Sequence, residues 1–205
     1  VGRTPLAAQL GAERAGIALE RGYVVVDERY QTTVPGIFAI GDLIASPQLA
    51  HVAAAEGVAA VETLVGIRAP GRIDPRRIPA CVYSHPEVAS IGLTEAAARA
   101  QGYDVKTAVV PLRAFGRAVA SAETEGVVKL VSEVRYGELL GCHIVGACAT
   151  ELIAEAAVLM GLEGTVSDLA RTVHAHPTFS EALMEGALAS LGEAPALDGV
   201  VDRHH

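Results

Sequence analysis

The residues with the clearest potential for chemistry lie near the C-terminal end of the chain. This stretch reads His174-Ala175-His176-Pro177-Thr178-Phe179-Ser180-Glu181. A carboxylate that hydrogen-bonds one ring nitrogen of a histidine fixes the tautomer and raises the basicity of the imidazole, so that the other nitrogen can accept a proton near neutral pH. The structural alternative makes Pro177 the first helical residue and pairs Thr178 with Glu181 in a capping box. Spacing alone leaves both interpretations open.

Two further candidates lie in the first quarter of the chain. Ile40-Gly41-Asp42 ends an expected strand, where a carboxylate can bind a hydroxylated ligand or can instead cap the next turn. Gln48-Leu49-Ala50-His51 begins an expected Ala-rich helix, whose N-terminal N–H groups can face an anionic group. The residues alone favour the alternative, an ordinary Ala-rich core helix with a packed or surface His51.

The elements that must position these residues change in kind along the chain. In the first part we expect two helices and two short strands, at residues 6–18, 48–65, 22–27 and 37–40. Residues 66–75, which are dense in Gly, Pro and Arg, are expected to form a linker. Beyond it we expect four strands and three helices, at residues 80–83, 105–111, 126–132, 139–145, 94–101, 150–162 and after 177. Strands grouped with helices to one side predict an α+β second part.

Composition and charge exclude several classes of protein. The 205 residues are 51% hydrophobic and 20% charged, which indicates a folded chain of one or two domains. With 16 Lys+Arg against 24 Asp+Glu, a net charge of −8 and 4% aromatic residues, the chain lacks the basic surface that nucleic acids and anionic lipids require. The most apolar stretch, residues 139–162, contains His143, Glu151 and three glycines. We therefore expect no nucleic-acid partner and no membrane span.

The cysteines indicate the cellular compartment. The chain has an odd number of cysteines, namely Cys81, Cys142 and Cys148. Their spacing matches neither a disulfide framework nor a zinc site. We therefore expect a reducing compartment, the cytoplasm, and no bound metal. All three cysteines are expected to be buried as small hydrophobic residues.

Several motifs, taken in chain order, resemble the pyridine nucleotide-disulphide oxidoreductase family. Residues 33–42 and 47–51 are similar to its second flavin-binding segment, residues 82–95 to the entry of its dimerisation domain, and residues 137–151 to the central strand and helix of that domain. Residues 174–181 resemble the active-site signature of the dihydrolipoamide dehydrogenase branch. This resemblance implies FAD and NAD as cofactors, a homodimer, and the lipoyl domain of a 2-oxo acid dehydrogenase complex as a partner.

The resemblance also implies roles for individual residues. His176 matches the base that deprotonates a dihydrolipoamide thiol, and Glu181 matches its orienting partner. The thiolate then attacks a redox disulfide, and electrons pass to FAD and on to NAD. The cofactor-binding positions comprise one that holds the ribitol hydroxyls of FAD (Asp42), its neighbour Gly41, the helix start near the flavin pyrimidine edge (Gln48, Leu49, Ala50 and His51), and Gly2, which is expected to contact NAD.

The resemblance divides the chain and also exposes departures from the family pattern. Residues 1–72 correspond to the end of the NAD-binding domain with the second FAD-binding segment, and residues 73–205 to an antiparallel-sheet α+β dimerisation domain. The sequence has no G-x-G fingerprint and no C-x₄-C redox pair. We therefore expect the C-terminal portion of a longer enzyme, inactive without its N-terminal half. A glutathione reductase-like enzyme and a catalytically empty dimerisation module are the alternatives.

Overall fold

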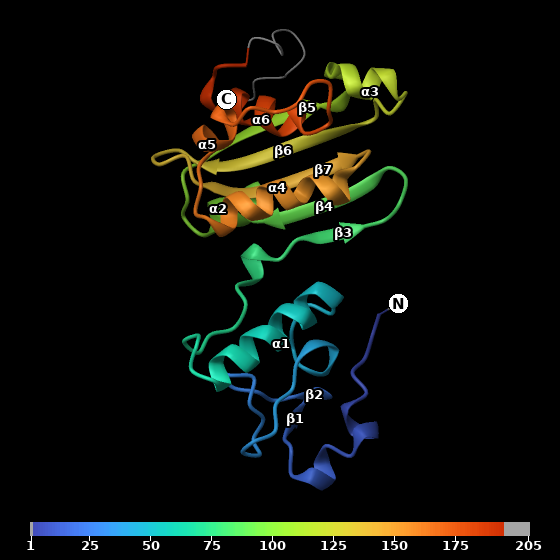
Figure 1. Cartoon of the computed structure of the whole chain (residues 1–205), viewed down its shortest axis with the longest axis vertical. Coiled ribbons are helices and arrows are strands. Elements are labelled where there is room, and N and C mark those ends of the chain that lie inside the picture. Colours follow the sequence, from blue (N-terminus) through green and yellow to red (C-terminus); the bar gives the residue numbers. More distant parts are fainter. Residues whose placement is uncertain (1, 195–205) are drawn as a thin grey trace. The chain divides into compact units, whose positions relative to one another are not determined.

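The computed structural model describes residues 2–194, and the chain divides into two compact units between Pro75 and Arg76 (Figure 1). Each unit has its own core of buried residues. Among the described residues, no helix combines the length and the apolar character needed to cross a bilayer.

The first unit contains one long helix, α1 (Ala50–Leu64), and little other regular structure. Strands β1 (Leu19–Glu20) and β2 (Tyr23–Val24) form a short antiparallel pair. Its core consists of a few residues around the fully buried Tyr30 ring. The Tyr30 hydroxyl accepts a hydrogen bond from the N–H of Ile73 at 3.1 Å, which ties the end of the unit to its centre.

Two elements expected in the first unit are wrong. The helix predicted over residues 6–18 is replaced by two 3-10 turns, Ala7–Leu10 and Glu13–Ala15. Each turn ends at a left-handed glycine, Gly11 or Gly16, which stops helix propagation. The strand predicted over residues 37–40 is reduced to one bridge between Gln31 and Phe38. The helix predicted over residues 48–65 is confirmed, although α1 begins two residues later.

The second unit is built on a five-stranded antiparallel sheet with strand order β3-β4-β7-β6-β5 (Figure 1). The strands are β3 (Ala80–Val82), β4 (Glu87–Gly92), β5 (Val105–Pro111), β6 (Gly126–Glu133) and β7 (Leu139–Gly146). The helices are α2 (Glu95–Ala100), α3 (Gly116–Ala120), α4 (Ala149–Gly161), α5 (Val166–Arg171) and α6 (Glu181–Leu191).

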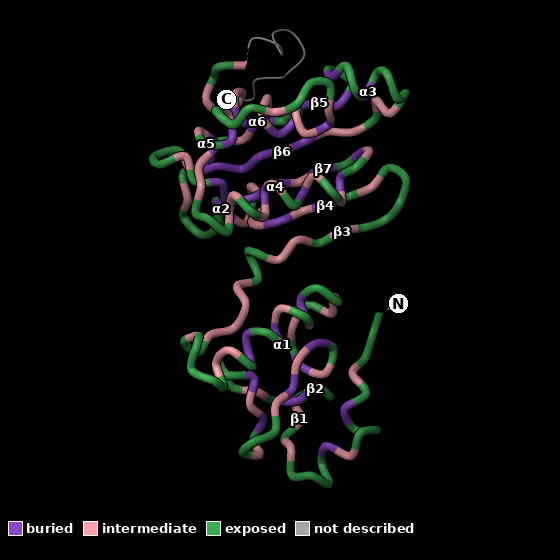
Figure 2. The backbone as a smooth tube through the Cα atoms, viewed as in Figure 1, coloured by how far each residue is buried: buried purple, intermediate pink, exposed green. Residues whose placement is uncertain are grey.

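The main core of the second unit lies between one face of this sheet and two helices. Helix α4 packs on β4 and β7, and α6 packs on β5 and β6. Gly186 of α6 lies so close to β6 that an added Cβ would be 3.2 Å from the Leu130 side chain. Buried positions accordingly run along β6 and β7 in Figure 2.

The second unit has the predicted α+β composition, and the four predicted strands are present. The prediction missed β4, α3 and α5, and α6 begins four residues after Pro177. The prediction that all three cysteines are buried was wrong. Cys142 is buried, but Cys81 is half-buried and Cys148 is exposed, because Cys148 occupies a left-handed turn (φ +60°) between β7 and α4.

Candidate functional site

His176 and Glu181 form a hydrogen-bonded pair in the second unit. The loop between α5 and α6 carries His176, and Glu181 is the first residue of α6. His176 Nδ1 lies 2.8 Å from Glu181 Oε1. An ionised carboxylate can only accept, so Nδ1 carries the proton and Nε2 is the atom that can accept one. The His176 side chain is 76% exposed and the Glu181 side chain 15%, so the imidazole faces solvent and the carboxylate is sheltered.

The surroundings of Glu181 keep its carboxylate ionised. Burial alone would raise the pKa of Glu181. The backbone N–H of Thr178, which donates to Glu181 Oε2 at 2.8 Å, acts in the opposite direction. Together with the His176 ring N–H, and with the positive charge that His176 and His174 carry when protonated, it lowers the pKa of Glu181 below its usual value. The carboxylate is therefore negative at neutral pH and can orient the His176 ring.

Only half of the capping box considered for Thr178 and Glu181 forms, the hydrogen bond from the Thr178 N–H to the Glu181 carboxylate, and Pro177 is not helical. The residue before the helix is Ser180, which makes no side-chain capping hydrogen bond. Thr178 instead donates its hydroxyl to the carbonyl of Ala175 at 2.7 Å. Because Glu181 is itself the first helical residue, its carboxylate reaches back to the loop. The His176–Pro177 peptide bond is cis.

Gly41 and Asp42 lie in the first unit, in a 3-10 turn (Gly41–Leu43) rather than at the end of a strand. The N–H of Gly41 donates to Glu56 Oε2 at 2.7 Å, and Glu56 is a buried residue of α1. Gly41 has φ +66°, and an added Cβ would lie 2.9 Å from the Cβ of Ala53. Only glycine fits this turn against α1 without displacement. The Asp42 side chain is 57% exposed, so its carboxylate faces solvent.

Arg3, which the sequence analysis did not single out, links Gln48 at the start of the predicted helix segment to Asp42. Gln48 and Leu49 precede α1, while Ala50 and His51 form its first turn. Arg3 donates to the carbonyl of Gln48 at 2.5 Å and lies 3.9 Å from Asp42 Oδ2. Gly2 is exposed beside Arg3. No sequence signal marks Arg3, because 45 residues separate it from Gln48.

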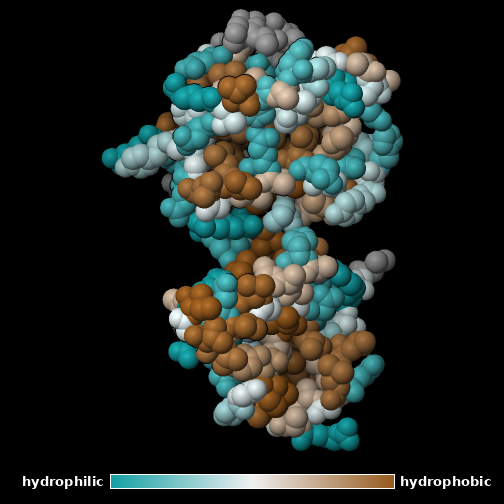
Figure 3. All heavy atoms as spheres, in the orientation of Figure 1, coloured by the Kyte–Doolittle hydropathy of each residue, from teal (hydrophilic) through white to brown (hydrophobic). Residues whose placement is uncertain are grey.

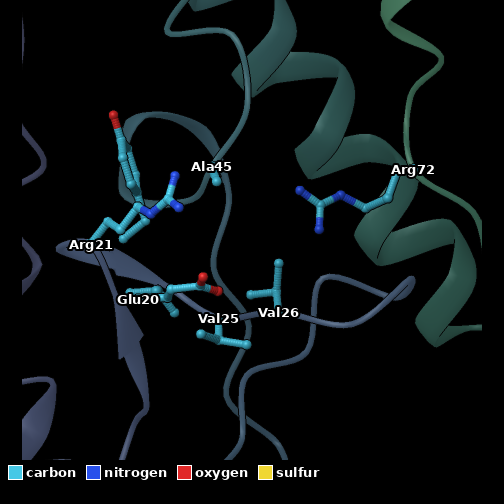
Figure 4. A pocket seen from close by; sticks show the side chains of 8 residues that line it. Glu20, Arg21, Val25, Val26, Ala45 and Arg72 are labelled. Atoms are coloured by element: carbon cyan, nitrogen blue, oxygen red, sulfur yellow. The ribbon is translucent and has the colours of Figure 1, made fainter.

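A cavity of about 340 Å³ also opens in the first unit. Its lining includes Glu20, Arg21, Ala45 and Arg72, and Figure 4 shows the Arg72 side chain extending toward it from the side opposite Glu20 and Arg21. This volume is at the low end for a ligand pocket. None of the predicted site residues lines the cavity. Within residues 2–194, no group of three or more His, Cys, Asp or Glu side chains is arranged to hold a metal ion.

Comparison with known protein families covers both units. The family model for the dimerisation domain of pyridine nucleotide-disulphide oxidoreductases matches residues 78–187. A second model, described as pyridine nucleotide-disulphide oxidoreductase, matches residues 1–57. The chain belongs to the pyridine nucleotide-disulphide oxidoreductase family. The resemblance inferred from the sequence motifs is thereby confirmed at the level of the family.

The relatives and solved structures of this family are longer than the chain. A dihydrolipoyl dehydrogenase of Bacillus subtilis is 42% identical over 194 residues, which are 95% of this chain and 41% of the relative. One from Thermus scotoductus is 45% identical over 190 residues, or 92% and 41%. The crystal structure of Mycobacterium tuberculosis LpdA gives a TM-score of 0.85 at 34% identity, covering 92% of this chain and 41% of that protein. The chain therefore spans about two fifths of the length of these relatives.

Proposed function

We propose that this chain supplies the catalytic base and part of the flavin-binding region of a dihydrolipoamide dehydrogenase. Such an enzyme oxidises the dihydrolipoyl groups of 2-oxo acid dehydrogenase complexes and reduces NAD. The observation that carries the proposal is the 2.8 Å contact between His176 Nδ1 and Glu181 Oε1, which leaves Nε2 on an exposed ring to accept a proton. The names of the curated relatives support the substrate class.

The proposed chemistry of this chain is a proton transfer. His176 Nε2 takes the proton of a dihydrolipoyl thiol, which becomes a thiolate, the nucleophilic form of sulfur. The ring becomes an imidazolium with both nitrogens protonated. Glu181, held negative by the Thr178 N–H, stabilises that positive charge and fixes which nitrogen reacts.

The proposed FAD site lies in the first unit and comprises Gly41, Asp42, Gln48, Leu49, Ala50 and His51. These residues fit a flavin nucleotide in two respects. The exposed Asp42 carboxylate can accept hydrogen bonds from hydroxyl groups, and the N-terminus of α1, a helix of 15 residues, offers N–H groups to a ligand that gains negative charge. Bound FAD would supply the two-electron acceptor, from which NAD takes the electrons. Gly2 is proposed to contact NAD.

The proposed partners are a second copy of this chain and a lipoyl domain, and the family's dimerisation domain supports the first. One row of register partners crosses β3, β4, β7 and β6 on the sheet face opposite α4 and α6. This valine row consists of Val82, Val88, Val145 and Val127. Val82 is 59% exposed and Val88 and Val145 are each 36% exposed. A second copy would remove this apolar surface from water. We propose the cytoplasm as the compartment, since all three cysteines are free thiols.

The two units suggest the domain assignment that we propose. Residues 1–72 are the end of the NAD-binding domain with the second FAD-binding segment, and residues 73–205 are the dimerisation domain. The structural division at Pro75 lies close to the proposed boundary. The family models, at residues 1–57 and 78–187, lie on either side of it.

The test replaces the matching segment of the Bacillus subtilis relative with this chain and measures NAD reduction by dihydrolipoamide. We expect activity, and we expect His176→Gln to lower the rate by about 10²–10⁴-fold because general-base catalysis is lost. The visible flavin spectrum should be unchanged. His85→Gln is the matched control, since His85 is also exposed and also precedes a proline. A His176→Gln protein with the full rate would overturn the assignment of the base. A dimeric replacement protein without activity would indicate a dimerisation module only.

A further inference from the structure

A second histidine in the loop before α6 has an environment opposite to that of His176. His174 precedes His176 by two residues, yet its side chain is 5% exposed whereas that of His176 is 76% exposed. Val173, the residue before it, is 95% exposed. His174 is therefore a buried point in an otherwise exposed stretch. A buried imidazole needs partners for both ring nitrogens.

Both ring nitrogens of His174 have such partners. Nδ1 lies 2.8 Å from the carbonyl oxygen of Thr172, and Nε2 lies 2.5 Å from Oε1 of Glu155 in α4. The carbonyl oxygen can only accept, so Nδ1 carries a proton. Nε2 then either donates to an ionised Glu155 or accepts from a protonated Glu155. In both cases the pair holds two protons and has no net charge, which suits its burial.

The charged groups that face His174 come from two helices. Glu155 is contributed by α4, and Glu181, at the start of α6, lies close enough that charge on His174 lowers its pKa. The Cys142 thiol of β7 is close enough to Glu155 to be affected by its charge. Its burial, assisted by the charge of Glu155, raises the pKa of Cys142 to about 12, so this thiol stays neutral. His174 is thus next to both helices that pack on the sheet.

These contacts place His176 between two fixed points of the loop. On one side, His174 is attached to α4 through Glu155. On the other, Thr178 donates its N–H to Glu181 and its hydroxyl to the carbonyl of Ala175. Between them the side chains of residues 175–177 are exposed, so packing alone does not fix the His176 ring.

We propose that His174 and Glu155 are positioning residues that hold the loop on α4, so that His176 Nδ1 can donate its hydrogen bond to the Glu181 carboxylate. The importance of that hydrogen bond for catalysis rests on the proposed function above. The positioning itself is a property of the folded chain and can be measured without any reaction.

The experiment measures the tautomer of His176 by ¹⁵N NMR of its imidazole in the full 205-residue chain at neutral pH. In the parent chain we expect the Nδ1–H form to dominate, because Glu181 accepts that proton. Glu155→Ala removes the attachment to α4. We expect it to lower the ratio of Nδ1–H to Nε2–H tautomer about fivefold, the effect of losing one hydrogen bond that favours the observed loop position.

Glu155→Gln distinguishes positioning from simple support of α4. The Gln side-chain amide can donate to His174 Nε2 while Nδ1 still donates to Thr172, so we expect the parent tautomer ratio to return. Glu151→Ala, an exposed position one turn earlier in α4, is the matched control and should leave the ratio unchanged. Backbone amide signals from β6 and β7 report whether each variant is folded.

An unchanged ratio in folded Glu155→Ala would overturn the proposal, and so would failure of Glu155→Gln to restore it. Should Glu155→Ala not fold, Glu155→Asp gives the same readout, because it keeps the charge but shortens the side chain by one methylene. No change in its ratio would again overturn the proposal. An inactive replacement enzyme would contradict the proposed function and leave this NMR result unaffected.

Discussion

The second unit, which contains the five-stranded sheet, and the first unit, which contains α1, differ in how far their apolar residues are buried. In the second unit, β6 and β7 and the helices α4 and α6 enclose side chains such as Leu130 and Ile144, which are fully buried. In the first unit, α1 leaves Val58, Val61 and Leu64 between 58% and 65% exposed. Figure 3 shows apolar side chains gathered on the visible face of this first unit. Exposed apolar residues on one helix are typical of a surface that contacts another protein surface.

This difference indicates which parts of the chain hold their shape through packing and which depend on a few specific contacts. The second unit has the larger core. The core of the first unit is small and is supplemented by the hydrogen bonds of Gly41 with Glu56 and of Tyr30 with Ile73. Substitutions that shorten a large buried side chain should therefore lower the stability of the second unit most. Changes of single polar contacts or of backbone geometry should matter most in the first.

The largest expected effect tests the core of the second unit. Leu130→Ala in β6 removes a fully buried side chain that contacts α6 near Gly186. We expect it to lower the free energy of unfolding by about 3–4 kcal/mol, since it leaves a cavity in a packed core. Urea unfolding followed by hydrogen exchange in residues 126–133 measures this. Val109→Ala, on the neighbouring strand and 40% exposed, is the control and should cost under about 1 kcal/mol. Equal losses for both variants would contradict the comparison.

The next effect concerns backbone geometry in the first unit. Gly41→Ala should cost about 2–3 kcal/mol, because alanine adopts φ +66° poorly and its Cβ would lie 2.9 Å from Ala53. Gly36→Ala is the control, since φ is +82° there but an added Cβ meets open space. It should cost only about 1 kcal/mol. Hydrogen exchange of the α1 amides measures both, and equal costs would show that the close approach to α1 contributes nothing.

A smaller effect is expected from one hydroxyl group. Tyr30→Phe keeps the buried ring but removes the acceptor of the Ile73 N–H. We expect a loss of about 1 kcal/mol in the stability of the first unit, the usual contribution of one hydrogen bond. Tyr23→Phe in the same unit serves as the control in the same thermal unfolding experiment. If Tyr30→Phe matches the parent protein, the contact to residue 73 does not stabilise the unit.

The smallest effect depends on pH and belongs to α6. Burial and the negative charge of Glu181 raise the pKa of Glu185, whose Oε2 is buried without a hydrogen-bond partner in the described part of the chain. The folded state therefore holds this proton more tightly than the unfolded state. The stability that this tighter proton binding by Glu185 contributes is complete below the pKa of Glu185 in the unfolded chain, near 4.3. It is lost as the pH rises through the higher pKa of Glu185 in the folded chain.

Glu185→Gln removes this penalty because it cannot ionise. We expect the variant to be more stable than the parent at pH 7 by under about 1 kcal/mol, with the difference disappearing below about pH 4. Thermal unfolding at several pH values measures it. A variant that is less stable than the parent at pH 7 would contradict this account of Glu185.

An element could be predicted from the sequence where its own residues determine its conformation, and not where contacts with distant residues do. Residues 105–111 form β5 with the predicted bounds, because a segment rich in β-branched residues (Val105, Thr107, Val109 and Val110) favours a strand locally. The missed strand β4 has a mixed sequence and owes its conformation to pairing with β7, whose residues lie about fifty positions further along the chain. In the first unit, Gly11 and Gly16 ended a helix that the surrounding residues favour, and their glycine identity was the available signal.

The candidate site was predictable where residues lie close in sequence. His176 and Glu181 are five residues apart, and the structure brings them within hydrogen-bonding distance. Their roles remain a proposal. Partners contributed by distant elements gave no signal: Glu155 for His174, Glu56 for Gly41, and Arg3 for Asp42. The true capping box, Thr165 with Asp168, has a recognisable spacing and was overlooked in favour of Thr178.

The hydrogen bond from Gly41 to the buried Glu56 has a consequence for any ligand of the first unit. It attaches the turn that carries Asp42 to the middle of α1, whose first residues are the other proposed ligand contacts. The two halves of the proposed binding surface are therefore held together before any ligand binds. A ligand that touches both loses little affinity to ordering the protein, because that conformational entropy is already lost when the chain folds.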